Sequence, residues 1–221
     1  MAARETTDGV NWAGFVLIGG FVIFSVGAII GFVAPSLRDA PWEGDLAAIA
    51  GNPAAYRWAN GLILASGIVT ALGLASLNVR FADRSRSWAS MGLVAFGFAA
   101  VFLALDRILS MEVTTWAVSQ SQETALVVFD AFDQFDDGLS GWFYFTGFAS
   151  LALYGIALTQ TQLTRGSGWL FVGVGLLGIG LAIVDGVIPG MIFLGTLGLA
   201  LATWRLGQPP KPDTETNTPA P

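Results

Sequence analysis

The sequence predicts an all-α fold: a polytopic membrane protein built as a six-transmembrane-helix bundle, with an amphipathic interfacial helix in the third loop. Of its 221 residues, 54% are hydrophobic and only 12% are charged, whereas soluble proteins average about 25% charged residues. Charge-free apolar runs recur along the chain, and about 20 such residues suffice to cross a bilayer as a helix. Tryptophans lie at the ends of these runs, as they do at the two surfaces of a membrane.

Six apolar runs define the expected spans. They are Trp12 to Ala34, Trp58 to Val79, Trp88 to Leu105, Trp142 to Thr161, Trp169 to Val184 and Val187 to Trp204. Five runs open with a tryptophan, and the sixth closes with one. We therefore expect a single transmembrane domain over residues 1–206. The proline-rich residues 207–221 have nothing to bury and are expected to form a disordered cytoplasmic tail.

The basic residues predict the orientation, because short loops rich in arginine and lysine stay in the cytoplasm. With the N-terminus inside, the cytoplasmic basic residues are Arg4, Arg80, Arg84, Arg86, Arg165, Arg205 and Lys211. Only Arg38, Arg57 and Arg107 then lie outside. The sequence thus predicts a multi-pass protein of the cell membrane with both termini in the cytoplasm.

The third loop, Asp106 to Gly141, is the longest, and its second half has helical periodicity. Its apolar side consists of Ala125, Val128, Phe129, Phe132 and Phe135. Asp130, Asp133 and Asp137 gather on the other side, and Asp136 alone lies toward the apolar side. We expect a short helix on the outer surface of the membrane, with a solvated acidic face. In an alternative interpretation, Asp130, Asp133 and Asp137 bind calcium or another hard cation through their carboxylate oxygens.

The chain contains no histidine and no cysteine, which excludes the usual ligand sets for haem, iron–sulfur clusters and structural zinc. We expect no cofactor, although a carotenoid or a chlorin without an axial histidine remains open. The net charge of −6 argues against a nucleic-acid partner. The expected partners are membrane lipid and either other membrane subunits or further copies of this chain.

Two features invite comparison with intramembrane proteases. Residues 138–141 spell GLSG, which resembles the GxSG serine motif of six-helix rhomboid proteases. A nucleophilic serine needs a histidine to accept its proton, so Ser140 is interpreted as a turn or cap residue. Asp106 and Asp185 are expected at similar depth, as in aspartyl proteases, but the glycine–aspartate motif of those enzymes is missing. With Arg107, these two aspartates are the first candidates to line an outward-facing cavity.

Glycine is frequent, with 28 residues, and most glycines lie within the spans. Small residues allow membrane helices to approach closely. The expected packing positions are Gly27, Gly31, Gly61, Gly67, Gly173, Gly175, Gly178 and Gly180. Asn60, a polar residue within the second span, is expected to form a hydrogen bond across helices.

Three segments carry a family resemblance. They are the first helix GGFVIFSVGAIIGFVAP, the long third loop, and the C-terminal half from GWFYFTGFASLALYGIALTQ to VGLLGIGLAIVDGVIPG. In this arrangement the chain resembles an uncharacterised bacterial and archaeal family of integral membrane proteins with six helices. The resemblance implies a multi-pass membrane architecture and no known activity, so it transfers no functional residue.

The expected function is non-enzymatic. Few polar groups lie inside the spans, which favours a structural, regulatory or partner-subunit role. The alternative is a transporter or binding protein for a small or lipophilic solute, because an apolar route would need no buried charge.

Overall fold

All regular structure that the computed structural model describes is helical. The described residues are 12–33, 46, 49–161, 164–184 and 190–204. The helices with defined bounds are α1 (Trp12–Val33), α3 (Pro53–Asn78), α4 (Asp83–Ala117), α5 (Gln122–Thr159), α6 (Arg165–Ile183) and α7 (Met191–Thr203). No strand occurs within the described residues. The predicted all-α class is therefore confirmed.

Five helices, α1, α3, α4, α5 and α6, are long and apolar enough to cross a membrane. The sixth apolar run is shorter than expected, because α7 begins only at Met191, after Gly190 in the left-handed conformation with φ 93°. Its 13 residues extend about 20 Å, less than the hydrocarbon thickness of about 30 Å. The start of the expected span, residues 187–189, lies outside the described residues. Several apolar helices thus indicate a membrane protein, and the sixth crossing stays a prediction.

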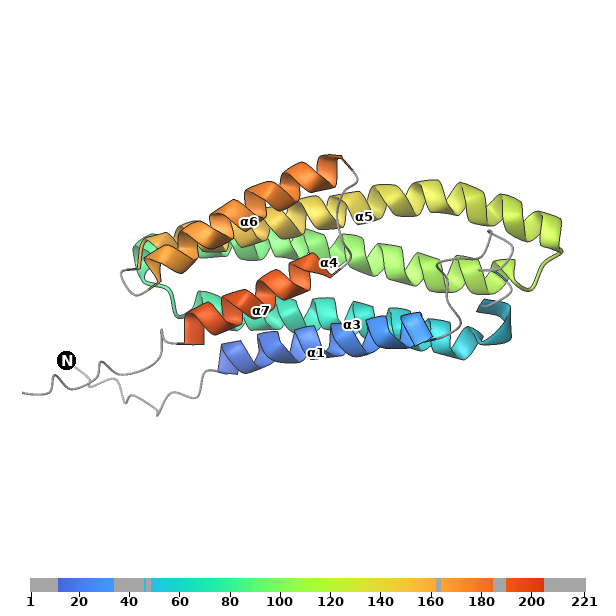
Figure 1. Cartoon of the computed structure of the whole chain (residues 1–221), viewed down its shortest axis with the longest axis horizontal. Helices are drawn as coiled ribbons and strands as arrows, with labels where there is room; N and C mark the ends of the chain where they lie inside the picture. Colours follow the sequence, from blue (N-terminus) through green and yellow to red (C-terminus); the bar gives the residue numbers. More distant parts are fainter. Residues whose placement is uncertain (1–11, 34–45, 47–48, 162–163, 185–189, 205–221) are drawn as a thin grey trace, which may run out of the picture.

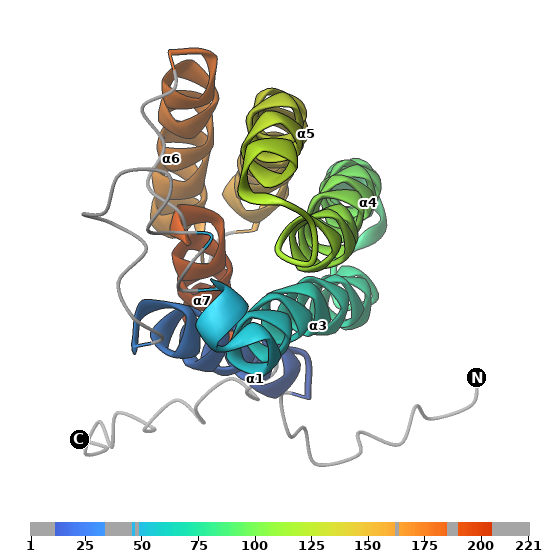
Figure 2. The same cartoon turned by 90° about the vertical axis from the view of Figure 1, so that its right-hand side faces the viewer.

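The helices form an arc that α7 closes. Figure 2, a view along the bundle, shows α1, α3, α4, α5 and α6 in this order, with α7 between α6 and α1. At one end of the bundle, α1 begins, α7 ends, and the turns from α3 to α4 and from α5 to α6 are found (Figure 1). We call this the terminal end. The opposite end, where α4 turns into α5, is the hairpin end.

The third loop differs most from expectation. The sequence predicted a loop from Asp106 to Gly141 containing a separate interfacial helix, but α4 continues to Ala117 and α5 already begins at Gln122. The two helices have 35 and 38 residues, or about 52 and 57 Å, and they extend past α6 and α7 in Figure 1. Ser121 caps α5, because its hydroxyl accepts a hydrogen bond from the Thr124 amide. Residues 106–141 are therefore one helical hairpin, which we call the hairpin.

The tip of the hairpin has a small apolar core of its own. Leu46, Ala117 and Ala125 are buried there, and Val128 and Phe129 pack against them. Three members of the expected apolar side of the interfacial helix therefore contact this cluster. Phe135, from the same side, is 55% exposed.

α5 and α6 approach each other at glycines on the terminal side of the hairpin. A Cβ atom at Gly155 would lie 2.6 Å from the Val172 amide nitrogen, and one at Gly168 would lie 2.5 Å from the Thr159 amide nitrogen. A Cβ atom at Gly175 would lie 2.7 Å from the amide nitrogen of Ala152. These distances leave no room for a side chain.

Other glycines of the spans have free space beside them. Gly61 in α3 and Gly166, Gly173 and Gly180 in α6 have no atom of a neighbouring element within 4 Å of an added Cβ. Helix α6 therefore has one glycine face against α5 and another that is open.

Candidate functional site

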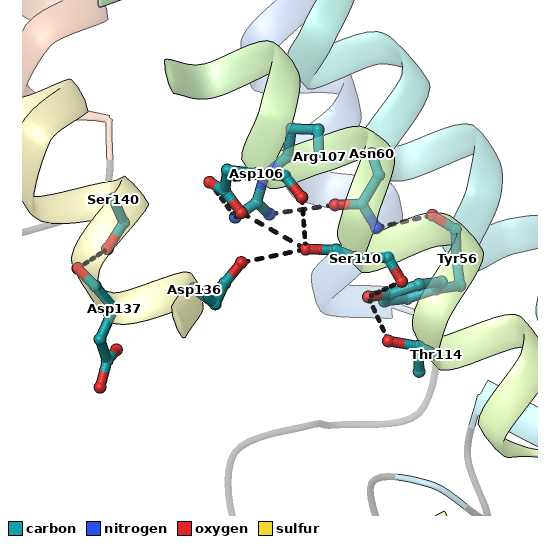
Figure 3. Close-up of polar contacts among 9 residues, drawn as sticks. All are labelled: Tyr56, Asn60, Asp106, Arg107, Ser110, Thr114, Asp136, Asp137 and Ser140. Carbon is teal, nitrogen blue, oxygen red and sulfur yellow. Dashed lines mark hydrogen bonds and ion pairs between the residues drawn. The ribbon is translucent and has the colours of Figure 1, made fainter. Parts of the chain in front are cut away.

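Polar side chains of three helices meet where the hairpin leaves the bundle (Figure 3). We call this cluster the polar junction. Its members are Tyr56 and Asn60 of α3, Asp106, Arg107, Ser110 and Thr114 of α4, and Asp136 of α5. Asp106, Ser110 and Thr114 follow one another at intervals of four residues, so they share one face of α4.

An ion pair with little access to solvent lies at the centre of the polar junction. Asp106 is 1% exposed, and the Arg107 guanidinium donates to both of its carboxylate oxygens, from Nη2 at 2.7 and 2.6 Å and from Nε at 3.1 Å. Neighbouring residues of a helix do not face each other, so the long arginine side chain must fold back over Asp106. This geometry provides the buried carboxylate with the charged partner that it needs.

Asn60 connects the ion pair to α3. Its Oδ1 accepts a hydrogen bond from Arg107 Nη1 at 3.0 Å, and its Nδ2 donates to the Tyr56 carbonyl oxygen at 3.0 Å. The expected hydrogen bond of Asn60 across helices is therefore confirmed. Tyr56 contributes a second link, because its hydroxyl lies 3.4 Å from both the Ser110 carbonyl oxygen and Thr114 Oγ1.

Ser110 connects the ion pair to α5. Its hydroxyl lies 2.8 Å from the Asp106 carbonyl oxygen, 3.3 Å from Asp106 Oδ1 and 3.2 Å from Asp136 Oδ1. The Ser110 hydroxyl thus has acceptors on both arms of the hairpin and lies within 3.3 Å of both carboxyl groups.

The junction holds charge in place. It contains two carboxyl groups and one guanidinium, and the chain has no histidine or cysteine. Ser110 donates its proton to carboxyl and carbonyl oxygens of its own cluster. The chemistry that this arrangement supports best is the fixing of three helices to one another.

The structure separates the candidates that the sequence grouped together. It brings Asp106 and Arg107 into contact, whereas Asp185 lies outside the described residues, so the cavity expected around these three residues stays a prediction. Ser140 is a helical residue of α5, and its hydroxyl donates to the Asp137 carbonyl oxygen at 3.1 Å.

The proposed cation ligands lie on the hairpin. Asp130 and Asp137 are exposed and Asp133 is half-buried. In the described part of the chain, no three side chains from histidine, cysteine, aspartate or glutamate are grouped so that they could hold a metal ion. The structure therefore does not bring Asp130, Asp133 and Asp137 together as a ligand set.

Four members of the junction were not predicted as site residues. Tyr56, Ser110 and Thr114 carry no motif, but Ser110 and Thr114 could have been found from their spacing to the charged Asp106. Asp136 left a clearer signal, because it alone among the acids of its helix lay toward the apolar side. A carboxylate on a face that packs against other helices needs a polar partner, and Ser110 is that partner.

A second feature lies beside the junction. A groove of ≈ 350 Å³ runs between α5 and the last turn of α6, and its lining residues are Asp137, Gly138, Gly141, Trp142, Phe145, Ala182 and Ile183. None of the residues of the polar junction lines it. The groove is almost entirely apolar, with Asp137 as its one charged residue.

Comparison of the chain with protein-family models, with curated proteins and with solved structures finds no match. The junction and the groove must therefore be interpreted from their own chemistry.

Proposed function

We propose that the chain is a multi-pass protein of the cell membrane that crosses the bilayer six times and keeps both termini in the cytoplasm. The arrangement of helix ends supports this proposal, because α1 begins and α7 ends at the same end of the bundle (Figure 1). There Phe15 and Trp204 are in contact, with ring centroids 5.1 Å apart. At this end Arg80 lies in the turn before α4, and Arg84 and Arg165 lie in the first turns of α4 and α6, as expected for a cytoplasmic face.

The hairpin then projects outside the cell. Helices α4 and α5 exceed the hydrocarbon thickness of about 30 Å by roughly 20 Å or more. Their charge-free parts, from Trp88 to Leu105 and from Trp142 to Thr159, lie on the terminal side of the hairpin. The hairpin itself has seven acidic residues and one basic residue, a composition suited to water.

We infer that the role of the protein is non-enzymatic: the bundle holds an acidic helical hairpin in a fixed position outside the membrane, where another membrane subunit or a second copy binds it. The polar junction is the observation that carries this inference. It ties α3, α4 and α5 together through a buried ion pair at the point where the hairpin leaves the bundle. Close backbone contacts at glycines fix α6 against α5.

The exposed apolar side chains of the hairpin support a partner role. Trp116, Val127 and Phe135 are each more than half exposed, although all three lie in the part of the chain that would be in water. Aromatic residues are enriched at protein interfaces. We therefore place the contact with a partner on the hairpin.

The absence of native cysteines makes the topology directly testable by single-cysteine labelling. Ser119→Cys lies in the turn between α4 and α5, and Ser87→Cys lies in the first turns of α4; both positions are exposed. We expect a membrane-impermeant maleimide to label Ser119→Cys on intact cells, and Ser87→Cys only after permeabilisation. Lys211→Cys should behave like Ser87→Cys. External labelling of Lys211→Cys while Ser87→Cys stays protected would mean an odd number of crossings, and external labelling of both would mean the reversed orientation.

The partner role is tested by a photoreactive amino acid at Phe135, with the same group at Ser87 as the matched control. We expect irradiation to cross-link position 135 to one defined polypeptide, either a second copy or another subunit. The same group at position 87 should give no such cross-linked product. A hairpin that forms no cross-link to protein in native membranes contradicts the proposed role.

A second function, the binding of a small or lipophilic solute, is favoured by the groove between α5 and α6. Its lining is apolar, and its volume of ≈ 350 Å³ falls within the range of about 300–1,000 Å³ for small-molecule sites.

A further inference from the structure

The groove exists because α5 presents glycines where α6 ends. Gly138 and Gly141 of α5 line it, and a Cβ atom at either position would have no atom of a neighbouring element within 4 Å. Further toward the terminal end, Gly168, Gly175 and Gly178 of α6 are in close contact with α5. The two helices therefore touch along most of α6 and leave a hollow beside its last turn.

The lining combines apolar surface with one free negative charge. Trp142, Phe145, Ala182 and Ile183 offer ring and aliphatic surface. Asp137 lies one helical turn from Gly141, on the hairpin side of the groove. The ion pairs in the described part of the chain join Arg57 to Glu112 and Arg107 to Asp106, so no arginine there neutralises Asp137.

We propose that this groove binds a single-chain lipophilic amine, with the hydrocarbon chain against the apolar lining and the ammonium group beside Asp137. Apolar surface recognises the chain, whereas a carboxylate and an indole both attract an ammonium group. Asp133 lies one turn from Asp137 on the same helix and Asp130 lies two turns away, and their negative charge disfavours an anionic headgroup. The small volume of the groove favours one chain over two.

The position of the groove suggests where the ligand comes from. Trp142 begins the apolar part of α5, and indoles prefer the headgroup region of a bilayer. In the proposed topology this region belongs to the outer leaflet, so the source of the ligand rests on the proposed function. The binding itself does not, because it depends only on the contact between α5 and α6.

The test uses the full chain in phosphatidylcholine nanodiscs and a photoreactive dodecylammonium probe that carries a diazirine in its chain. Peptide mass spectrometry locates the attachment. We expect labels on residues 138–145 and 182–183. Dodecyltrimethylammonium should compete for these sites, and uncharged dodecanol or anionic dodecyl sulfate should compete at least five-fold less well.

Two pairs of variants separate the contributions of shape and charge. Gly141→Leu fills the groove and should reduce labelling at least ten-fold, whereas Gly173→Leu, at an equally open glycine of α6, should leave it unchanged. Asp137→Asn should weaken competition by dodecyltrimethylammonium about five-fold, as for an exposed ion pair. Asp130→Asn, an exposed acid that does not line the groove, should have little effect.

Three results would overturn the proposal. Labels spread over all apolar helices and insensitive to Gly141→Leu would mean simple partitioning into lipid. Equal competition by dodecanol would mean that the groove does not recognise the ammonium group. A label attached to another polypeptide would mean that this polypeptide covers the groove. Nanodiscs expose both faces of the membrane, so the binding experiment does not depend on topology. A failure of binding therefore does not contradict the proposed topology, and a reversed topology does not contradict the binding.

Discussion

Helix α5 contacts its neighbours in two different ways along its length. Toward the terminal end its backbone touches α6 at Gly155, Gly168 and Gly175. Toward the hairpin end it is tied to α4 by the carboxyl group of Asp136 and the hydroxyl of Ser110. In lipid the hydrophobic effect does not drive apolar helices together, so close backbone packing has to hold α5 and α6 against each other. Near water, a buried ion pair and its hydrogen bonds can hold the helices together instead.

The polar contact of α5 with α4 and the glycine contact of α5 with α6 should therefore be weakened by different kinds of substitution. We expect the largest effect at the polar junction from Arg107→Ala, because it leaves the buried Asp106 carboxylate without its partner. Loss of one member of a buried pair costs about 3–5 kcal/mol. Thermal unfolding in detergent measures the change in stability.

The matched control for Arg107→Ala is Arg57→Ala. Arg57 lies 3.8 Å from Glu112, and their side chains are 50% and 70% exposed, so we expect a change of about 0–1 kcal/mol. Equal destabilisation by the two variants would contradict the special role of the buried pair.

Much of this contrast could not be predicted from the sequence, because hydropathy marks where a helix leaves lipid and not where the helix ends. The charge-free run of α4 stops at Leu105, and the appearance of Asp106 and Arg107 was interpreted as the start of a loop. A helix in water tolerates charged residues well, so α4 continues for about three turns beyond Leu105. The helical class and the five long apolar helices were predictable, because a charge-free run of about 20 residues favours a membrane helix.

The partners within the polar junction depend on the register between helices. Asp136 lies 26 residues from Ser110 in the sequence, and only the alignment of α4 with α5 brings their side chains together. The orientation of Asp136 toward the apolar side indicated that it had a partner, but not which one. Likewise, the spacing of glycines in α6 could not distinguish the face that packs against α5 from the open face.

The second largest effect is expected at this packed glycine face, from Gly175→Ala. The new methyl group would lie 2.7 Å from both the Ala152 amide nitrogen and the Phe148 carbonyl oxygen. Backbone atoms cannot move aside cheaply, so we expect a loss of about 1–3 kcal/mol, measured by the same unfolding assay. Gly173→Ala, two residues away on the open face, should leave stability unchanged or raise it slightly. Similar losses from both variants would mean that α6 has no preferred packing face.

The smallest effect is expected from Ser110→Ala, which breaks a link between the two helices of the hairpin; Ser140→Ala, which breaks a bond within one helix, is its control. Ser110→Ala removes the hydroxyl that joins Asp106 to Asp136, and a typical hydrogen bond contributes about 0.5–1.5 kcal/mol to stability. We expect about 1 kcal/mol. Ser140→Ala removes a hydroxyl that donates only within its own helix, and its effect should stay within about 0.5 kcal/mol. Hydrogen exchange distinguishes the two further: Ser110→Ala should speed the exchange of amides in the hairpin and not in α6, since the loosened contact lies between α4 and α5. Faster exchange throughout the bundle would instead mean that the hairpin and the membrane helices are held together as one unit.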